Sequence, residues 1–468
     1  IIDTAGGVGG TWYWNRYPGV MCDIESYQYL PLLEELDYIP SRRYAYGEEI
    51  RLHLQAVAER FDLERDALFH TRVTRTVWDE DAGRWTVHTD RGDEISCRYY
   101  VLAVGILNLV KLPDIPGMDD FDGWAFHTAR WDYSKTGGAP GQPLTGLADQ
   151  SVALVGTGAS GLQCLPGLAE AAKHVYVFQR TPSAIGVRGN RPTDPSFAEN
   201  LAPGWQKARM DNFQSIMLGR PVEVDLTDDG WTHHYAAVQN PPRRDRDGQP
   251  LAVADFMRGA EELDYAIMEE HRRRVDELVS DPEVAAILKP YYRYLCKRPC
   301  FHDEYYGAFN SPNVTLVDCP AGIDRITAAG PVVGGTQYEV DCIVYGTGFE
   351  AVITAGMDNP VDVVFTPSGE RLLYQGPDAV AFVPVCARYP YEVWVAPRAP
   401  VAGFHQLSEA QRADLARALI ASSNLSASQM FDHPDIGAQL LDRIGAGAEV
   451  VKLDGTSWRE ETREVRRA

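Results

Sequence analysis

The chain has 468 residues, which is enough for two or three domains that each bury a hydrophobic core. Hydrophobic residues make up 45% of it and charged residues 24%, as in an ordinary globular protein, but the formal net charge is −22. This charge argues against nucleic acid or an anionic membrane surface as a partner. The longest apolar run, residues 99–110, is about half of a membrane span. The eight cysteines form no CxxC pair and no cluster at zinc-ligand spacing. We therefore expect free thiols, a cytoplasmic protein and no metal site.

The N-terminal residues Ile1-Ile2-Asp3 are typical of the end of a strand, and a glycine-rich turn follows them. An acidic residue that ends the second strand of a Rossmann unit normally binds the ribose of FAD or NAD, so Asp3 is a candidate ligand. No strand, GxGxxG loop and helix precede it, so we expect the first domain to lack its N-terminal βα unit. The next stretch, GGTWYWNRYPGVMCDIES (residues 9–26), is so aromatic that we expect a ligand to lie against it.

Residues 42–149 complete the first predicted domain, which we place at residues 1–149. Apolar residues at helical spacing predict a helix over residues 48–61, and RWTVHT (84–89) and YYVLAVG (99–105) are typical of strands. A segment rich in Gly, Pro and Thr at 137–149 indicates a linker. Just before it, FDGWAFHTARWD fits the pattern Phe-x-Gly-x3-His-x3-Trp, although a loop with core aromatics and a satisfied histidine is a competing interpretation. The residues of this pattern are Phe121, Gly123, His127 and Trp131.

A dinucleotide-binding loop is predicted within residues 151–182. This stretch has the pattern of a strand, a glycine turn, a helix and a second strand, which together form a βαβ unit. Gly156 would permit the tight turn, Gly158 the close approach of a pyrophosphate, and Gly161 the close packing of helix and strand. The amides at the helix N-terminus would hold the phosphate charge. The expected cofactor contacts in this loop are Gly156, Thr157, Gly158, Ser160 and Gly161.

The second strand of this unit ends in Gln179-Arg180-Thr181 instead of an acidic residue. An acid would accept hydrogen bonds from a ribose 2′-hydroxyl, whereas Arg180 would pair with a 2′-phosphate. The sequence therefore favours NADP over NAD, with these three residues at the adenosine end of the cofactor. The competing interpretation of Arg180 is a solvated charge at a strand end.

The remainder of the chain predicts a second domain over residues 150–345 and a C-terminal segment of uncertain origin over 346–468. Residues 190–290 form a polar, mostly helical insertion whose strongest helix is FMRGAEELDYAIMEEHRRRVDELV. Strand patterns return at NVTLVD and YEVDCIVYGTGFE. Beyond residue 365 a hairpin over 379–397 and a helix over 408–423 are expected. The fold class is therefore α/β, with two Rossmann-like domains, the first incomplete, and a small α+β segment.

Residues 1 to about 350 resemble the Baeyer–Villiger monooxygenases, class B flavoproteins with one FAD domain and one NADP domain. The pattern from Phe121 to Trp131 is similar to the fingerprint of that family, and GGTWYWNRYPGVMCDIES is similar to its segment along the flavin. VLAVG (101–105) and IVYGTGF (343–349) resemble its hinge strands, and KRPCFHDEYYGAFNSPNVTLVD, from Lys297, resembles its Lys-Arg-Pro segment.

The resemblance implies an enzyme that uses NADPH, FAD and O2 to convert a ketone into an ester or lactone through a flavin peroxide. Arg298 would be the catalytic guanidinium that keeps the peroxide anionic, because it cannot lose its proton. Asp23 would be its carboxylate partner, with a helix N-cap as the competing role of Asp23. Lys297 and Arg180 would share the 2′-phosphate of NADPH. The implied FAD contacts are Asp3, Gly9, Gly10, Thr11, Trp12, Asp23 and Tyr29.

Two alternatives remain open on the sequence. One is an N- or S-oxidising flavin monooxygenase, and the other is a truncated or rearranged NADP-binding relic without activity. In addition, residues 368–419 resemble part of galactose-1-phosphate uridylyltransferase, although an unrelated strand pair and helix would give the same pattern. This segment has no His-x-His motif, since His405 and His433 stand alone, so we expect no transferase activity. The sequence of residues 190–290, where we expect the substrate pocket, does not identify the ketone.

Overall fold

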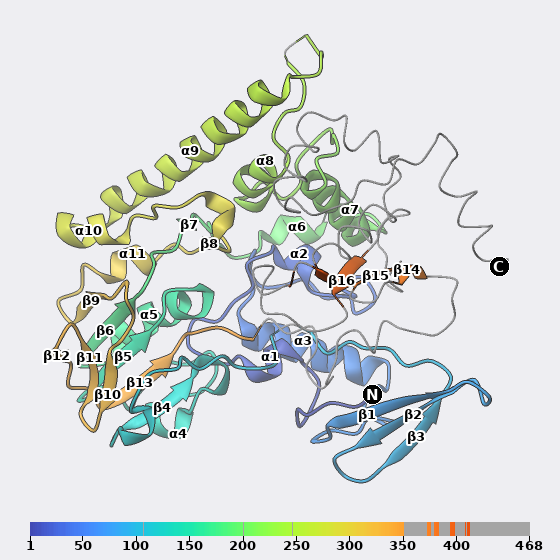
Figure 1. Ribbon diagram of the computed structural model, residues 1–468, viewed down its shortest axis with the longest axis horizontal. Coiled ribbons are helices and arrows are strands. Elements are labelled where there is room, and N and C mark those ends of the chain that lie inside the picture. Colours follow the sequence, from blue (N-terminus) through green and yellow to red (C-terminus); the bar gives the residue numbers. More distant parts are fainter. Residues whose placement is uncertain are drawn as a thin grey trace. The chain divides into compact units, whose positions relative to one another are not determined.

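The structure is a computed structural model, shown in Figure 1. It describes residues 1–105, 107–199, 201–245 and 247–350, the backbone of three strands beyond them, and residues 408, 410 and 411. The chain divides into two compact units, Ile1–Val352 and Ile353–Ala468, and each is described by itself. The finer predicted division of the first unit, at residue 149, stays a prediction.

A five-stranded parallel sheet forms the framework of the first unit. Its strands have the order β4-β13-β5-β6-β9, so β5 lies between β6, the next strand along the chain, and β13, the last strand of the sheet in sequence. The order reverses beside β5, which is the point where α/β proteins of this kind bind their ligands. The strands are β4 (Trp124–His127), β5 (Ser151–Val155), β6 (His174–Gln179), β9 (Val314–Asp318) and β13 (Cys342–Tyr345).

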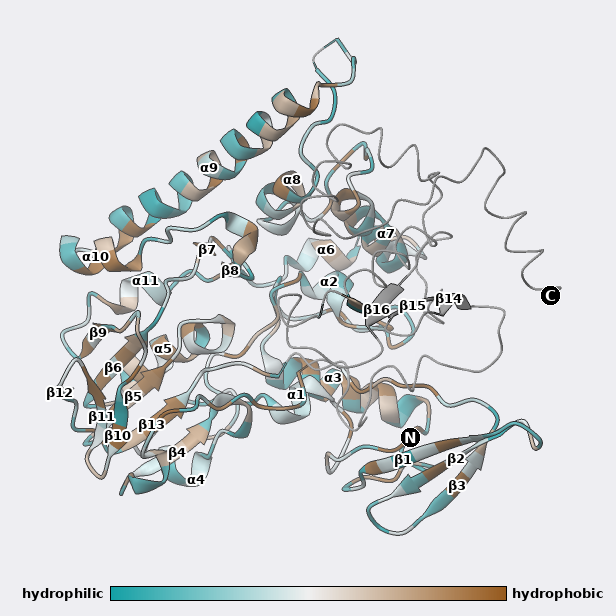
Figure 2. Cartoon of the chain, in the orientation of Figure 1, coloured by the Kyte–Doolittle hydropathy of each residue, from teal (hydrophilic) through white to brown (hydrophobic). Residues whose placement is uncertain are grey.

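Both faces of this sheet are covered, which explains why its strands are continuously apolar. Side chains such as Leu154 and Val177 pack against helices on one face, and Ala153 and Ile343 pack against a small antiparallel sheet on the other. In Figure 2 the central strands of the parallel sheet are brown, whereas α9 alternates between teal and brown. The covering helices are α5 (Ala159–Ala171), α9 (Val253–Leu278), α10 (Pro282–Leu288) and α11 (Tyr305–Ala308), and the small sheet contains β10 (Arg325–Thr327), β11 (Gly330–Val333) and β12 (Thr336–Gln337).

The first hundred residues form a separate small core and an antiparallel sheet. Leu30, Leu33, Tyr44 and Ile50 pack together in that core. The sheet has the order β1-β2-β3. The elements are α1 (Thr11–Trp14), α2 (Ser26–Tyr29), α3 (Gly47–Arg60), β1 (Val73–Asp79), β2 (Arg84–Thr89) and β3 (Glu94–Cys97), followed by η1 (Met118–Asp120), η2 (Thr128–Arg130) and α4 (Tyr133–Thr136).

The insertion between β6 and β9 is mainly helical, as predicted. It includes a turn of π-helix, a rare conformation that is frequent at functional sites. Its elements before α9 are β7 (Ile185–Gly186), α6 (Pro195–Glu199), α7 (Trp205–Met217), the π-helix η3 (Trp231–Tyr235) and α8 (Ala236–Gln239), and those after α10 are η4 (Tyr294–Cys296) and β8 (Cys300–Phe301).

The predicted α/β class, the βαβ unit around the glycine turn and the helix over 48–61 are confirmed. The predicted strand over 99–105 is wrong. These residues form no strand, and Tyr99 and Val101 are 85% and 81% exposed. A buried parallel strand needs hydrogen-bonded neighbours on both sides, and the described residues supply none here. The predicted strand at Ile2 is reduced to a single bridge with Leu68.

The second unit contains an antiparallel sheet of three strands, β14 (Leu372–Gln375), β15 (Ala379–Phe382) and β16 (Trp394–Pro397). The predicted hairpin over 379–397 is confirmed by the pairing of β15 with β16. Most of the helix predicted over 408–423, and most of the segment that resembles a uridylyltransferase, lie outside the described residues. Within the described part of the chain, every cysteine is a free thiol. Among those same residues, no helix has the length and apolar content to span a membrane.

Candidate functional site

One cavity of about 1420 Å³ in the first unit brings most of the predicted site residues together. It runs from the N-terminal aromatic stretch to the carboxyl edge of the parallel sheet, beside β5. Predicted site residues in its wall are Thr11, Trp12, Asp23, Tyr29, Gly156, Thr157, Gly158, Ser160, Arg180, Thr181, Lys297 and Arg298. A cavity of this size at the switch point of a parallel sheet can hold an extended cofactor.

The glycine turn after β5 has the geometry that a dinucleotide requires. Gly156 has a φ of +105°, and a Cβ there would lie 2.6 Å from the carbonyl oxygen of Gly346. A Cβ on Gly161 would lie 2.1 Å from the oxygen of Gly156, so the helix packs directly on the turn. By contrast, a Cβ on Gly158 would meet nothing within 4 Å. Gly158 is also the N-cap of α5, so an anion could approach the amides at the start of this helix.

Two alanine substitutions in this turn should separate nucleotide binding from folding. Gly161→Ala forces a Cβ into a backbone oxygen, so we expect it to destabilise the protein by about 1–3 kcal/mol and to weaken NADP⁺ binding. Gly158→Ala fits the folded backbone but fills the open space, so it should leave the melting temperature unchanged and weaken NADP⁺ binding about tenfold or more. Thermal unfolding and calorimetric titration measure both. Unchanged binding by Gly158→Ala would place the nucleotide elsewhere.

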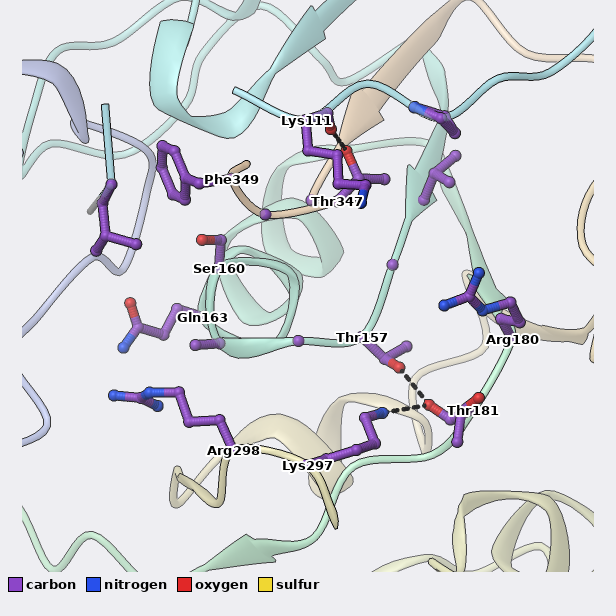
Figure 3. Close-up of a pocket in the computed structure, with 18 of the residues that line it drawn as sticks. Lys111, Thr157, Ser160, Gln163, Arg180, Thr181, Lys297, Arg298, Thr347 and Phe349 are labelled. Atoms are coloured by element: carbon purple, nitrogen blue, oxygen red, sulfur yellow. Dashed lines mark hydrogen bonds between the residues drawn. The ribbon is translucent and has the colours of Figure 1, made fainter. Parts of the chain in front are cut away.

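Arg180 and Lys297 lie at the far end of this turn, and Figure 3 shows both beside Thr181. Nζ of Lys297 donates to the carbonyl oxygens of Thr181 and Pro182, each at 3.1 Å. Burial lowers the pKa of Lys297; the Cys300 thiol opposes this effect and the Arg180 charge adds to it. In the ion pairs of the described residues, neither cation has a carboxylate partner. Two cations in one cavity wall without a carboxylate partner are suited to bind an anion.

At the other end of the cavity, Asp23 and Arg298 form an ion pair, with 2.7 Å between Oδ2 and Nη2. The Asp23 side chain is 9% exposed and that of Arg298 is 53% exposed. Burial lowers the pKa of Arg298, but Asp23 and Cys300 raise it by more, so the net shift is upward. Asp23 is not a helix N-cap, because α2 begins at Ser26 with Glu25 in the cap position. The cavity therefore contains a permanent cation that is held by a buried carboxylate.

Sequence reasoning missed two residues that contact this pair. Arg188 is buried and forms a second ion pair with Asp23, through Oδ1. Trp231, in the π-helix of the insertion, donates from Nε1 to the carbonyl oxygen of Asp23 at 2.9 Å, and its ring lies 5.6 Å from the Arg298 guanidinium. The two residues lie 165 and 208 positions from Asp23, in segments without a recognisable motif. No signal in a single sequence would have found them.

The aromatic stretch at residues 9–26 lies only partly against the cavity. Trp12 lines it and is fixed by a hydrogen bond from Nε1 to the hydroxyl of Tyr29, at 3.0 Å. Tyr13 and Trp14 do not belong to its wall, and each packs instead against an arginine, Arg16 at 4.7 Å and Arg130 at 3.9 Å. The density of aromatics therefore reflects cation–π packing as well as a ligand surface.

Several predicted cofactor contacts lie outside the wall of the cavity, and their roles stay predictions. Asp3 accepts a hydrogen bond from the amide of Ala5 at 2.8 Å. Gly9 and Gly10 have positive φ and start the turn into α1. Gly161 packs beneath the glycine turn, and Gln179 is fully buried with its Nε2 bonded to the carbonyl of Ile287.

The Phe-x-Gly-x3-His-x3-Trp segment lies outside the cavity wall but contacts a residue that lines it. His127 ends β4, is 4% exposed, and accepts a hydrogen bond from the Ala129 amide at Nδ1. Its ring packs edge-on against Phe349, which lines the cavity. Gly123 leaves no room for a Cβ, which would lie 2.4 Å from the oxygen of Asp341. Phe121 and Trp131 pack in the cores on the two faces of the sheet. None of the four belongs to the cavity wall.

The buried histidines should make the protein acid-sensitive. Burial lowers the pKa of His127, His271 and His302 from 6.5 to about 4. Between these values the unfolded chain binds more protons than the folded chain, so the free energy of unfolding should fall as the pH drops from 6.5 to 4. Each histidine contributes up to ~3 kcal/mol. Urea unfolding of the wild type and of His127→Asn, between about pH 7 and 4.5, measures this effect. An equal pH dependence of the two proteins would contradict it for His127.

The parallel sheet and the glycine turn at its switch point define an α/β protein with a Rossmann-like fold. No protein-family model matches the chain. It is 52% identical over 353 residues to pentalenolactone D synthase of Streptomyces arenae, covering 75% of this chain and 59% of that protein. It is 49% identical over 358 residues to a Baeyer–Villiger monooxygenase of Streptomyces coelicolor, covering 76% and 59%.

Solved structures give the same relationship. An open crystal structure of cyclohexanone monooxygenase matches with a TM-score of 0.60 and 33% identity, over 75% of this chain and 68% of that one. Steroid monooxygenase bound to NADP matches with a TM-score of 0.61 and 33% identity, over 74% and 66%. The chain belongs to the Baeyer–Villiger monooxygenase family. It spans 59% of the length of the two curated relatives named above.

Proposed function

We propose that this chain acts in a monooxygenase that uses FAD and NADPH to insert one oxygen atom of O2 into a ketone, giving an ester or lactone. The observation that carries the proposal is the shared cavity: the Asp23–Arg298 pair lines the same space as the glycine turn and the two unpaired cations. A candidate dinucleotide site and a fixed guanidinium therefore line one cavity. The reaction consumes one ketone, O2, NADPH and a proton, and yields the ester, NADP⁺ and water.

The residues present fit NADPH and one part of a site for FAD. For NADPH, the open side of Gly158 and the start of α5 suit the pyrophosphate, and Arg180 with Lys297 suits the 2′-phosphate. For FAD, Trp12 and Tyr29 offer apolar ring surface in the cavity wall, next to Asp23. When bound, FAD supplies the redox chemistry that links NADPH to O2, and the protein supplies binding, orientation and charge.

Arg298 would stabilise negative charge on oxygen during the reaction. A guanidinium stays protonated at every working pH and offers donors in a fixed plane. Asp23 holds it at the wall by one hydrogen-bonded ion pair, and the Trp231 ring lies over it. Because both partners are already in place, little reorganisation is needed as charge develops, and this is the condition under which electrostatic stabilisation is most effective.

The first test is a visible absorption spectrum of the purified chain after incubation with excess FAD and desalting. We expect retained flavin absorption that NADPH bleaches and air restores, and a product one oxygen atom heavier than the ketone supplied. NADH in place of NADPH is the control and should bleach the flavin much more slowly. A colourless protein, or bleaching without any oxygenated product, would overturn the proposal for this chain.

A further inference from the structure

Two guanidinium groups share the carboxylate of Asp23, one on each oxygen. Nη2 of Arg188 donates to Oδ1, and Nη2 of Arg298 pairs with Oδ2 at 2.7 Å. The two arginines differ sharply in exposure, since the side chain of Arg188 is 2% exposed and that of Arg298 is 53% exposed. Arg298 lines the cavity, whereas Arg188 does not belong to its wall. The triad as a whole carries one net positive charge.

The fold fixes Arg188 independently of Asp23. The backbone amides of Arg188, Gly189 and Asn190 donate to the Asp303 carboxylate at 2.9, 3.1 and 3.2 Å. Nη2 of Arg188 also donates to the carbonyl oxygen of Phe301 at 2.6 Å, next to the short β7–β8 pairing. Nε and Nη1 are buried without a hydrogen-bond partner among the described residues. Asp23 is therefore the carboxylate that compensates this buried charge.

This sharing limits how Arg298 can bind. A carboxylate with both oxygens free pairs with arginine through two parallel hydrogen bonds, which is the stronger arrangement. With Oδ1 bonded to Arg188, Arg298 pairs with Asp23 through Oδ2 alone. Nη1 of Arg298 makes a further 3.2 Å contact with the carbonyl oxygen of Pro299.

We propose that Arg188 is a positioning residue: by bonding Oδ1 of Asp23 it keeps Arg298 on Oδ2 alone, with its half-exposed guanidinium in the wall of the cavity. The expected effect of Arg188 on turnover rests on the proposed function. Its effect on the geometry of Arg298 needs no turnover, so the two can be tested separately.

The experiment compares the wild type with Arg188→Met, Arg188→Lys and Arg209→Met. Arg209 is a matched control, because it forms a largely buried pair with Glu25, at 2.6 and 2.9 Å, in the same unit and does not touch Asp23 or Arg298.

Crystal structures locate Arg298, and steady-state kinetics give kcat and the KM for NADPH. In Arg188→Met we expect Arg298 to bind both oxygens of Asp23 and kcat to fall about 10- to 100-fold, with the KM for NADPH within about twofold. Arg188→Lys should restore much of kcat, since it returns the charge.

The inference is overturned if Arg298 keeps its single hydrogen bond in Arg188→Met and kcat falls no further than in Arg209→Met. Should the methionine variant fail to fold, Arg188→Gln takes its place, because glutamine removes the charge but can still donate to Phe301, and the same two outcomes decide. A wild type that forms no ester refutes the proposed function alone, since the crystal structures still report whether Arg188 controls the position of Arg298.

Discussion

Arg298→Met is expected to lower the rate of ester formation by about 10²- to 10³-fold, or ~2.7–4 kcal/mol, while NADPH binding changes little. Methionine keeps much of the length of arginine but removes the cation from the cavity. Asp23 retains its second partner, Arg188, so no buried carboxylate is left unpaired. The Arg298 side chain is half-exposed, so its loss should cost little folding stability. The variant should therefore be slow in the chemical step. Rapid-mixing measurements of NADPH oxidation, together with the yield of ester, would distinguish a slow chemical step from weakened NADPH binding.

A nearby arginine supplies the control for this variant. Arg293 lies five positions earlier and forms an exposed ion pair with Glu261, away from the cavity wall. Arg293→Met should keep the wild-type rate, because exposed pairs contribute little. An Arg298→Met protein that forms ester at more than about a third of the wild-type rate would show that the charge at this position is not used for catalysis.

The βαβ unit and its glycine turn could be predicted because the pattern that specifies them is local in the sequence. Gly156 and Gly161 lie within one turn where a Cβ would meet backbone oxygen, and Gly158 leaves the space beside that turn open. The strand before this turn and the helix after it have apolar patterns that the buried sheet requires. Arg180 follows directly from its place at the end of β6. Residues that are close in the sequence are also close in space here, so a pattern of about thirty residues is sufficient to predict this unit.

The other end of the site could be predicted only through its resemblance to a family, and then incompletely. Asp23 and Arg298 are far apart in the sequence, and their pairing depends on how the N-terminal segment packs against the insertion. Arg188 and Trp231 were missed because a contact across more than 160 residues leaves no local pattern. The segment 99–105 shows the opposite error: its apolar run is typical of a buried strand, but strand pairing is decided by partners elsewhere in the chain.

Arg180→Ala and Lys297→Ala should each lower kcat/KM for NADPH by about 10- to 100-fold and leave kcat/KM for NADH almost unchanged. The reason is that the two cofactors differ by the 2′-phosphate, and both cations lie in the cavity wall without a carboxylate partner in the described part of the chain. Lys173→Ala, which removes an exposed lysine just after α5, controls for the general loss of positive charge. Equal losses with NADPH and NADH would mean that these cations support the fold or another part of the cofactor, and would remove the basis for the preference for NADPH.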